Sequence, residues 1–275
     1  MRLQSRNKIP VYLILFVFVI FTALPLLWII MLSFKTSTEI VSGGVFALPK
    51  SLSLQNYLTA WSSGNVGRYF LNSIIVSVVS SVVTLIFGIP LAYSVSRLNW
   101  KLKDGVFTLI TIGIMLPIHA TLIPIFMVFS KLGLVNTYWS LIITYSASAL
   151  PITVYIVRNF LISVPYEIEE AAFLDGCSVI RAFFQVMVPT IKQSVVVVTI
   201  LNFLSFWNEY VMAVIMVTDP KMYTLPVGLA FFQNQYTADY GAIAACTVIS
   251  VLPVLIFYLI YNDVLEKGMV VGAMK

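Results

Sequence analysis

Long apolar runs, separated by shorter segments that carry most of the charged residues, dominate the sequence. A helix needs about 20 apolar residues to cross the hydrocarbon core of a bilayer, where it pairs nearly all of its own backbone amides. Six runs reach that length, and each predicts one membrane-spanning helix. The expected spans cover residues 11–32, 70–95, 106–129, 138–157, 194–217 and 240–261. We therefore expect an all-α membrane protein in which residues 1–275 form a single transmembrane domain.

The composition agrees with this pattern. Apolar residues make up 60% of the chain and charged residues only 10%, and the mean hydropathy of +0.98 lies outside the usual range of soluble domains. Cys177 and Cys246 do not indicate a disulfide framework, and two thiols alone make no metal site. The net charge of +5 does not favour nucleic-acid binding, because lysine and arginine in a membrane protein mainly mark the loops that stay inside.

The distribution of lysine and arginine predicts that both termini are cytoplasmic. Six spans place both ends on one side of the membrane, and positively charged loops are retained in the cytoplasm. In this topology eleven of the 16 basic side chains lie inside. They are Arg2, Arg6, Lys8, Arg97, Lys101, Lys103, Arg158, Arg181, Lys192, Lys267 and Lys275. The first run follows a basic stretch, as a secretory signal does, but it is longer than a signal core, so we expect a retained helix.

The charged segment between the fourth and fifth runs, residues 163–190, predicts two short helices joined by a sharp corner. Pro165 presets the backbone for a first helical turn, and the three glutamates that follow suit the positive end of a helix dipole. Gly176 can adopt the left-handed conformation that ends a helix. Ser178 then caps a second helix, which Pro189 ends. The topology places this two-helix loop in the cytoplasm.

Each of these two predicted helices has a face of its own. The first face holds Ile168, Ala171, Ala172 and Asp175, and the second holds Val179, Phe183, Val186 and Met187. An amphipathic helix on the inner leaflet, or a corner packed on its own bundle, also fits this pattern. An interfacial helix usually carries many lysines or arginines, whereas this one begins with three glutamates. A protein partner with a groove for the loop is therefore favoured.

The same segment resembles the EAA loop of bacterial ABC-importer permeases. The resemblance is carried by Glu170, Ala171, Ala172, Asp175, Gly176, Phe183 and Pro189. Other stretches are similar to landmarks of the carbohydrate-type permeases: "LSLQNYLTAW" (52–61), "FLNS" (70–73), "FWNEY" (206–210), "TLPVGLAFF" (224–232) and "KGMVVGAMK" (267–275). Together they resemble the maltose-type sugar branch along nearly the whole chain.

This resemblance implies a function and a set of partners. The implied protein is a permease of the bacterial cytoplasmic (inner) membrane, surrounded by lipid, that pairs with a second permease, usually a different chain. Its EAA residues dock into a cytoplasmic ATPase dimer, which binds the ATP and Mg²⁺, so no cofactor, catalytic residue or metal site is expected in this chain. An extracytoplasmic solute-binding protein delivers a sugar or oligosaccharide, and residues 219–240 resemble the loop that meets it. The residues expected to face that protein are Tyr223, Leu225, Pro226 and Gly228.

Polar residues within the expected spans are candidates for the solute pathway, because ionisable groups are costly in hydrocarbon. Asn202, Ser205 and Glu209 share one face at helical spacing, with Asn208 beside them. Such a stripe can hydrogen-bond sugar hydroxyls. In the alternative, Glu209 is structural and bonds to the partner subunit or to a backbone amide. His119, the single histidine, is more often bonded within a bundle than used as a proton relay.

Two other classes of membrane protein are alternatives. An ion-gradient-driven secondary transporter would use Glu209 or His119 as a proton site, but such proteins more often show repeated halves. An intramembrane enzyme would need a nucleophile with a base, or a set of metal ligands, within the spans, and the sequence shows neither pattern. The sequence also has no glycine-rich phosphate loop with Lys and Ser or Thr. An ATP-driven importer built on this chain would therefore take its energy from a partner.

Overall fold

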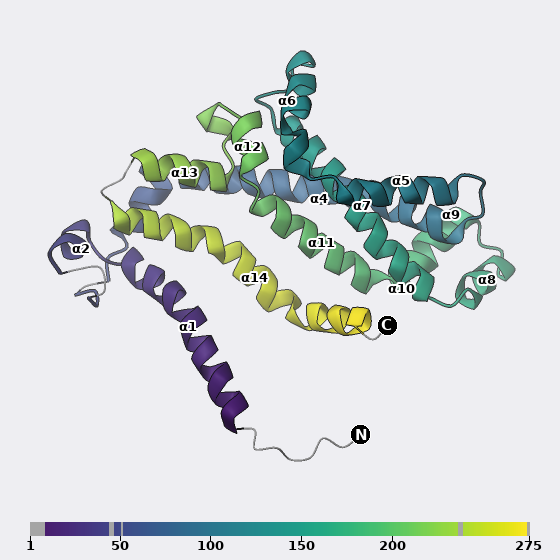
Figure 1. The fold of residues 1–275 in the computed structure, drawn as a ribbon, viewed down its shortest axis with the longest axis horizontal. Helices are drawn as coiled ribbons and strands as arrows, with labels where there is room; N and C mark the ends of the chain where they lie inside the picture. Colours follow the sequence, from purple (N-terminus) through teal and green to yellow (C-terminus); the bar gives the residue numbers. More distant parts are fainter. Residues whose placement is uncertain (1–8, 44–46, 51, 236–238, 274–275) are drawn as a thin grey trace. The chain divides into compact units, whose positions relative to one another are not determined.

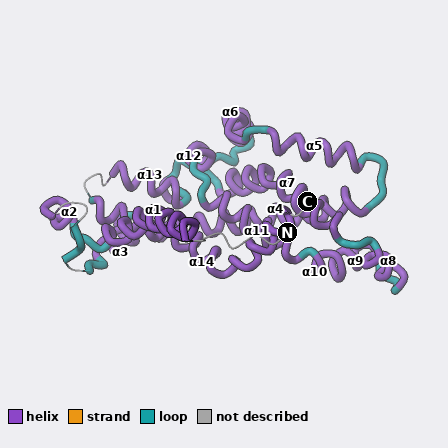
Figure 2. The backbone as a smooth tube through the Cα atoms, turned by 60° about the horizontal axis from the view of Figure 1, so that its bottom comes forward, coloured by secondary structure: helices purple, strands orange, loops and turns teal. Residues whose placement is uncertain are grey.

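The computed structural model describes residues 9–43, 47–50, 52–235 and 239–273 of the chain. These residues form helices and connecting loops, with no strand among them (Figures 1 and 2). The helices are α1 (Ile9–Ser33), α2 (Ser37–Gly43), α3 (Gln55–Leu58), α4 (Val66–Arg97), α5 (Lys103–Met115), α6 (Leu122–Lys131), α7 (Tyr138–Ser163), α8 (Glu167–Leu174), α9 (Val179–Ala182), α10 (Val188–Thr190), α11 (Lys192–Trp207), α12 (Val211–Met216), α13 (Leu225–Gln235) and α14 (Tyr240–Ala273). The all-α expectation is confirmed.

Four of the expected spans are single helices long and apolar enough to cross a membrane: α1, α4, α7 and the first part of α14. The other two belong to bent pairs of helices. Residues 103–115 and 118–131 meet at 91°, and residues 179–190 and 192–207 meet at 75°. By length and composition, the described part of the chain therefore has four candidate spans, or up to six if each bent pair is counted as one.

The third expected span, residues 106–129, is not one straight helix. Leu116 and Pro117 are extended, with ψ angles of 118° and 113°. A proline disfavours the helical conformation of the residue before it and has no amide hydrogen to donate. The helix therefore ends at Met115 and resumes after a short 3₁₀ turn, Ile118–Thr121 (η2), which Figure 2 shows as an interruption between α5 and α6.

The fifth expected span, residues 194–217, is also interrupted. Helix α11 ends at Trp207, and the short α12 begins only at Val211. Glu209 lies in the turn between them, so it does not continue the helical face of Asn202 and Ser205 as expected from the sequence. In contrast, α4, α7 and α14 continue through their internal prolines.

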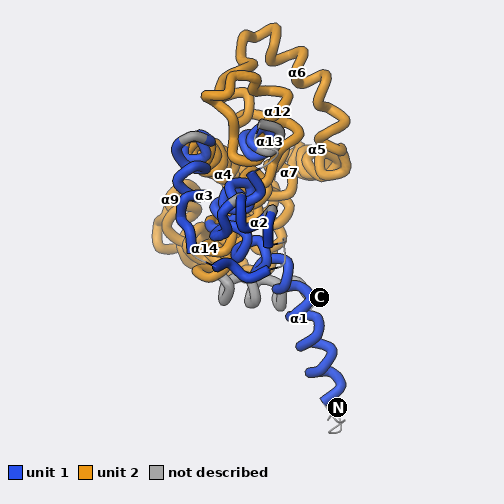
Figure 3. Tube along the Cα trace, turned by 90° about the vertical axis from the view of Figure 1, so that its left-hand side faces the viewer, with its two compact units in different colours: residues 1–67, 228–252 blue, residues 68–227, 253–275 orange. Residues whose placement is uncertain are grey.

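The chain divides into two compact units (Figure 3). The first comprises residues 1–67 and 228–252, and the second comprises residues 68–227 and 253–275. In the first unit, the buried amide of Asn56 donates to the carbonyls of Ser33 and Lys35 at 2.8 and 2.7 Å. These bonds satisfy carbonyls at the end of α1, where the helix provides no partners.

The second unit contains every candidate residue of the two-helix loop (163–190) and of the expected solute pathway. Helices α5 and α11 both pack against α7, as Figure 1 shows. The buried core of this unit continues from the spans into the loop. It comprises Ile89, Ala92, Tyr93, Val95, Val154, Val157, Leu161, Phe183, Met187, Ile191 and Val198.

Candidate functional site

The first half of the expected cytoplasmic loop, residues 163–190, has the predicted helix and glycine corner. Helix α8 begins at Glu167, two residues after Pro165, and its three glutamates lie in the first turn. Gly176 has a φ angle of +83°, and its amide donates to the carbonyl of Phe173 at 3.0 Å. The left-handed conformation of Gly176 therefore ends the helix, as expected for a glycine at this position.

The second half of the loop differs from the prediction at Pro189. Ser178 caps the second helix as expected, with its hydroxyl accepting from the amide of Arg181 at 3.4 Å. The helix then widens into a π turn, Phe183–Met187 (η3), and continues through Pro189 to Thr190. A wider turn changes the backbone pairing and gives the proline ring room that a regular α-helix lacks. Pro189 does not end the helix; the chain turns at Ile191 instead.

A buried ion pair attaches the loop to α4. The guanidinium of Arg97, the last residue of α4, lies 3.9 Å from the carboxylate of Glu169, and their side chains are 0% and 6% exposed. The hydroxyl of Tyr93 donates to the other oxygen of this carboxylate. The Arg97 guanidinium also lies 4.1 Å above the ring of Tyr166. This cluster of Tyr93, Arg97, Tyr166 and Glu169 is called the Arg97 cluster below.

The Arg97 cluster also joins the end of one helix to the start of the next. The guanidinium donates to the carbonyls of Leu161 and Val164 at the C-terminal end of α7, where partial negative charge accumulates. Glu169 lies in the first turn of α8, where an anion is favoured. One cation therefore sets the direction in which the loop leaves the membrane domain.

The loop residues singled out from the sequence divide between two faces. Ala172 and Phe183 are buried, and the ring of Phe183 lies 4.9 Å from that of Tyr93. Glu170, Ala171, Asp175 and Pro189 are exposed. Phe183 thus anchors the loop on its own bundle, whereas Phe184 points outward and is 62% exposed.

The loop between α12 and α13, expected from the sequence to be the outer loop, is held by side chains of two other segments. The side-chain oxygen of Asn136 accepts from the amides of Thr218 and Asp219 at 2.7 and 2.9 Å. The side-chain amide of Asn72 donates to the carbonyls of Lys221 and Tyr223 at 3.0 and 2.9 Å. The hydroxyl of Ser73 also accepts from the amide of Leu225 at 2.7 Å. Without these three side chains, five backbone groups of the loop would have to bond to water.

These bonds give a structural role to Asn72 and Ser73 of the stretch "FLNS" (70–73), which stood out in the sequence only by its resemblance to carbohydrate-type permeases. They also turn the side chains of the outer loop inward. Tyr223 and Leu225 are 8% and 1% exposed, Gly228 is buried and Pro226 is partly buried. Burial, with the Asp219 carboxylate as a second cause, raises the pKa of the Tyr223 phenol. The exposed residues of this loop are Thr218, Pro220 and Lys221.

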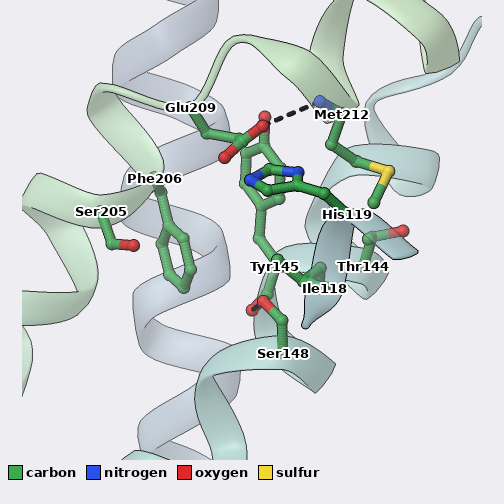
Figure 4. Close-up of a pocket in the computed structure, with 9 residues that line it drawn as sticks. All are labelled: Ile118, His119, Thr144, Tyr145, Ser148, Ser205, Phe206, Glu209 and Met212. Carbon is green, nitrogen blue, oxygen red and sulfur yellow. Dashed lines mark hydrogen bonds between the residues drawn. The ribbon is translucent and has the colours of Figure 1, made fainter. Parts of the chain in front are cut away.

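A small polar pocket lies where the two interrupted spans meet α7. Its volume is about 70 Å³. The lining residues are Ile118, His119, Thr144, Tyr145, Ser148, Ser205, Phe206, Glu209 and Met212. In Figure 4 the carboxylate of Glu209, the ring of Tyr145 and the imidazole of His119 point toward one another.

Two of the four pathway candidates, Ser205 and Glu209, line the pocket. The other two make separate contacts elsewhere. The amide of buried Asn202 donates to the hydroxyl of Thr153 at 3.0 Å and joins α11 to α7. Asn208 bonds back to the carbonyl of Leu204 within its own helix end. One oxygen of Glu209 accepts from the amide of Met212 at 2.8 Å. Glu209 therefore has the bond to a backbone amide that the structural alternative expected.

Tyr145 is one of the pocket residues that the sequence did not single out. Its ring stacks on that of Phe206 at a centroid distance of 5.4 Å, and its phenol oxygen is buried with no hydrogen-bond partner among the described residues. Tyrosine is common in apolar runs, and the face of α7 that buries Tyr145 together with Leu141 is defined only by the structure.

We predict that Glu169→Ala destabilises the protein far more than Glu167→Ala. Removing the buried carboxylate leaves the Arg97 guanidinium buried without its counter-charge, which costs about 3–5 kcal/mol. Glu167 is exposed in the same first turn of α8, so its replacement removes one surface charge only. Unfolding of both variants in detergent micelles, followed by denaturant titration, measures the difference. Equal stability of the two variants would contradict the role of the Arg97 cluster.

We predict that Asn72→Ala loosens the outer loop. The substitution removes both bonds to the carbonyls of Lys221 and Tyr223, and leaving buried polar groups unpaired costs about 1–3 kcal/mol. Backbone amides of residues 217–225 should exchange hydrogen about tenfold faster in deuterium-exchange mass spectrometry. Asn208→Ala is the matched control, because Asn208 bonds only within its own helix end. Unchanged exchange in Asn72→Ala would show that the loop is held by other contacts.

Comparisons with known proteins agree with this architecture. Residues 84–271 match the family described as the binding-protein-dependent transport system inner membrane component. The probable ABC transporter permease protein YurM of Bacillus subtilis is 35% identical, over 98% of this chain and 89% of the relative. The diacetylchitobiose uptake system permease protein NgcG of Streptomyces coelicolor is 37% identical, over 86% of this chain and 79% of the relative.

A solved structure has the same fold. A chain of a bacterial ABC transporter involved in the import of the acidic polysaccharide alginate superimposes with a TM-score of 0.84 at 23% identity, covering 96% of this chain and 99% of that chain. The family match covers more than half of the sequence and includes residues 163–190 and the residues of the polar pocket. The chain therefore belongs to the family of inner membrane components of binding-protein-dependent transport systems.

Proposed function

We propose that this chain is the permease subunit of an ABC importer for a sugar or oligosaccharide, and that residues 163–190 couple it to partner ATPases. The observation that carries this proposal is the shape of this loop, which consists of a helix, a glycine corner and a second helix. The Arg97 cluster holds the loop rigidly on its buried side. Its outward face is free to meet a partner. The family to which the chain belongs supports an import function, and the carbohydrate named for NgcG supports sugar as the solute class.

The outward face of the loop has the chemistry of a docking surface. Leu174, Ile180 and Phe184 are 89%, 72% and 62% exposed, and Glu170 and Ala171 lie beside them on α8. Large apolar side chains that face water together mark an interaction site. In this proposal an ATPase covers the apolar residues and pairs a cation with Glu170, while small Ala171 permits close approach. Phe183 and Ala172 are buried on the opposite side of the loop and hold it in place.

The other partners follow from the remaining surfaces. A second permease subunit pairs with the membrane domain, and an extracytoplasmic binding protein meets the outer loop held by Asn72 and Asn136. Because Tyr223, Leu225 and Gly228 are buried, the exposed residues Thr218, Pro220 and Lys221 make the direct contact. ATP and Mg²⁺ are bound by the ATPases, and both termini of this chain lie in the cytoplasm. Rigid-body motion of the ATPases then moves the loop and switches access to the pathway.

An ion-gradient-driven transporter is not favoured, although the pocket brings His119 and Glu209 together. Glu209 already bonds to the amide of Met212, and the family is one of binding-protein-dependent systems. Affinity purification in mild detergent discriminates the two mechanisms. Our proposal requires a second permease and an ATPase to co-purify, with ATP hydrolysis stimulated by a sugar-loaded binding protein. Recovery of the chain alone, with gradient-driven uptake in vesicles, would refute it.

We predict that Gly176→Val uncouples ATP hydrolysis from transport while the permease stays folded. A side chain in the left-handed conformation costs about 1–2 kcal/mol, so the corner should open and change the angle between α8 and α9. Gly133 also has a positive φ angle, +66°, but it lies in the loop between α6 and α7. Gly133→Val therefore introduces a similar strain away from the coupling loop.

Uptake and ATP hydrolysis measured in the same proteoliposomes test this prediction. Gly176→Val should hydrolyse ATP with little uptake, whereas Gly133→Val should retain the wild-type ratio of uptake to hydrolysis. Full transport by Gly176→Val would refute the coupling role of the corner.

A further inference from the structure

The polar pocket contains a buried hydroxyl that nothing in the described protein satisfies. The phenol oxygen of Tyr145 has no hydrogen-bond partner, and the residue is only 3% exposed. Buried polar groups nearly always have a partner, and an exception requires an explanation. Because Tyr145 lines the pocket, a molecule that occupies the pocket can supply the missing partner.

The groups around this oxygen suit a neutral hydroxyl. Glu209 uses one carboxylate oxygen for the amide of Met212, which leaves acceptor capacity on the carboxylate. The Tyr145 hydroxyl can donate, and the imidazole of His119 lies at the same end of the pocket (Figure 4). An alcohol both donates and accepts, so it can bond to Tyr145 and Glu209 together. The carboxylate of Glu209 disfavours an anion, and the described residues include no group of three potential metal ligands.

The residues at the open side of the pocket are of the kind that avoids lipid. His119, Ser148 and Ser205 are exposed, and Tyr145 lies ~10 Å along α7 from its first residue at 1.5 Å per residue. Polar side chains at that depth face a bundle interior or a water-filled cavity. Both helix interruptions, before Ile118 and after Trp207, border this pocket. Irregular backbone within the membrane is tolerated only where it is buried in protein or lines such a cavity.

The volumes indicate which part of a solute the pocket can hold. A pocket of about 70 Å³ admits a hydroxyl-bearing group but is well below the 300–1,000 Å³ typical of sites for whole ligands. A groove of about 350 Å³ adjoins it and shares Ile118, Thr144 and Ser148 as lining residues. The groove is mainly apolar, with Ile125, Phe129 and Pro151 among its walls. It can therefore hold the carbon-hydrogen face of a sugar ring.

We propose that the pocket is a hydroxyl-binding subsite on the solute pathway, in which Tyr145 donates to and Glu209 accepts from one end of a sugar while its ring lies in the adjoining groove. This inference rests on the proposed function as a sugar importer. It adds that this chain contacts the solute itself. It also assigns that contact to a tyrosine on α7 and to the turn between α11 and α12, rather than to the whole polar stripe expected from the sequence.

The test compares Tyr145→Phe with Tyr155→Phe in the complete importer, reconstituted in proteoliposomes with its second permease, ATPase and binding protein. N,N′-diacetylchitobiose, arabinotriose, raffinose and maltotriose are screened for stimulation of ATP hydrolysis, and the best of them is the probe. Tyr145→Phe keeps the ring that stacks on Phe206 and removes only the oxygen. We expect the uptake rate of the probe to fall about tenfold, the effect of losing one hydrogen bond to a buried group.

Two variants keep the result interpretable. Tyr155 lies on the same helix and is exposed, and it does not line the pocket, so Tyr155→Phe should transport at the wild-type rate. Glu209→Gln retains an oxygen that can accept from the amide of Met212, so the turn should persist while uptake of the probe falls. The binding protein is identical in all samples, so any difference arises in the membrane domain.

The outcomes separate the subsite from the proposed function. Slower uptake in Tyr145→Phe and Glu209→Gln, with wild-type uptake in Tyr155→Phe, supports the subsite. A sugar-stimulated wild-type complex with unaffected Tyr145→Phe overturns the subsite alone, because the pocket then holds only water. A wild-type complex that no sugar stimulates overturns the sugar assignment and the subsite with it.

Discussion

The burial of one guanidinium at the end of α4 determines how the two-helix loop, residues 163–190, is attached to the helices before it. Arg97 contacts the carbonyls that end α7, the carboxylate of Glu169 and the ring of Tyr166. Because a buried charge is tolerated only when it is paired, each of these groups has a fixed position relative to the others. The loop therefore cannot rotate freely about its connection to α7. A force applied to its outward face is transmitted to α4 and α7 together.

The same requirement, that polar groups away from water find partners, explains the outer end of this unit. Asn72, Ser73 and Asn136 bond to backbone groups of the loop that follows α12. A loop of this kind would otherwise depend on water for its backbone bonds. The unit is thus fixed at both ends by side chains that bond to the backbone of distant segments. Motion within it is expected at the helix interruptions between these ends, where backbone bonds are missing.

The polar pocket lies at those interruptions. Pro117 breaks one span, and the turn at Glu209 breaks another, so two stretches of irregular backbone come together beside α7. Regular helices hide their backbone and present only side chains, whereas a break exposes carbonyls and amides as well. The breaks therefore add polar backbone groups to the polar side chains of the pocket. This explains why the titratable groups His119 and Glu209 lie there and not along the straight helices.

Some features of this protein could be predicted residue by residue from its sequence. The apolar runs predicted the all-α fold and the positions of α1, α4, α7 and α14, because the bilayer imposes length and apolarity on every span. The corner at Gly176 and the cap at Ser178 were also predicted correctly, since both depend on the local backbone alone. Pro117 and Pro189 were not. Each proline has the same intrinsic chemistry, and only the surrounding packing determined that one breaks a span while the other continues through a π turn.

The sequence by itself determined a helical membrane protein with a loop of two short helices and a glycine corner, because period, length and turn chemistry are local properties. The tertiary structure alone decided which polar residues meet. It paired Arg97 with Glu169 across 72 positions of the chain, placed Asn202 in a helix contact, and brought Tyr145 and His119 to Glu209. A hydrogen bond or ion pair between distant segments depends on how helices cross and where they break, and hydrophobic periodicity contains no information about either.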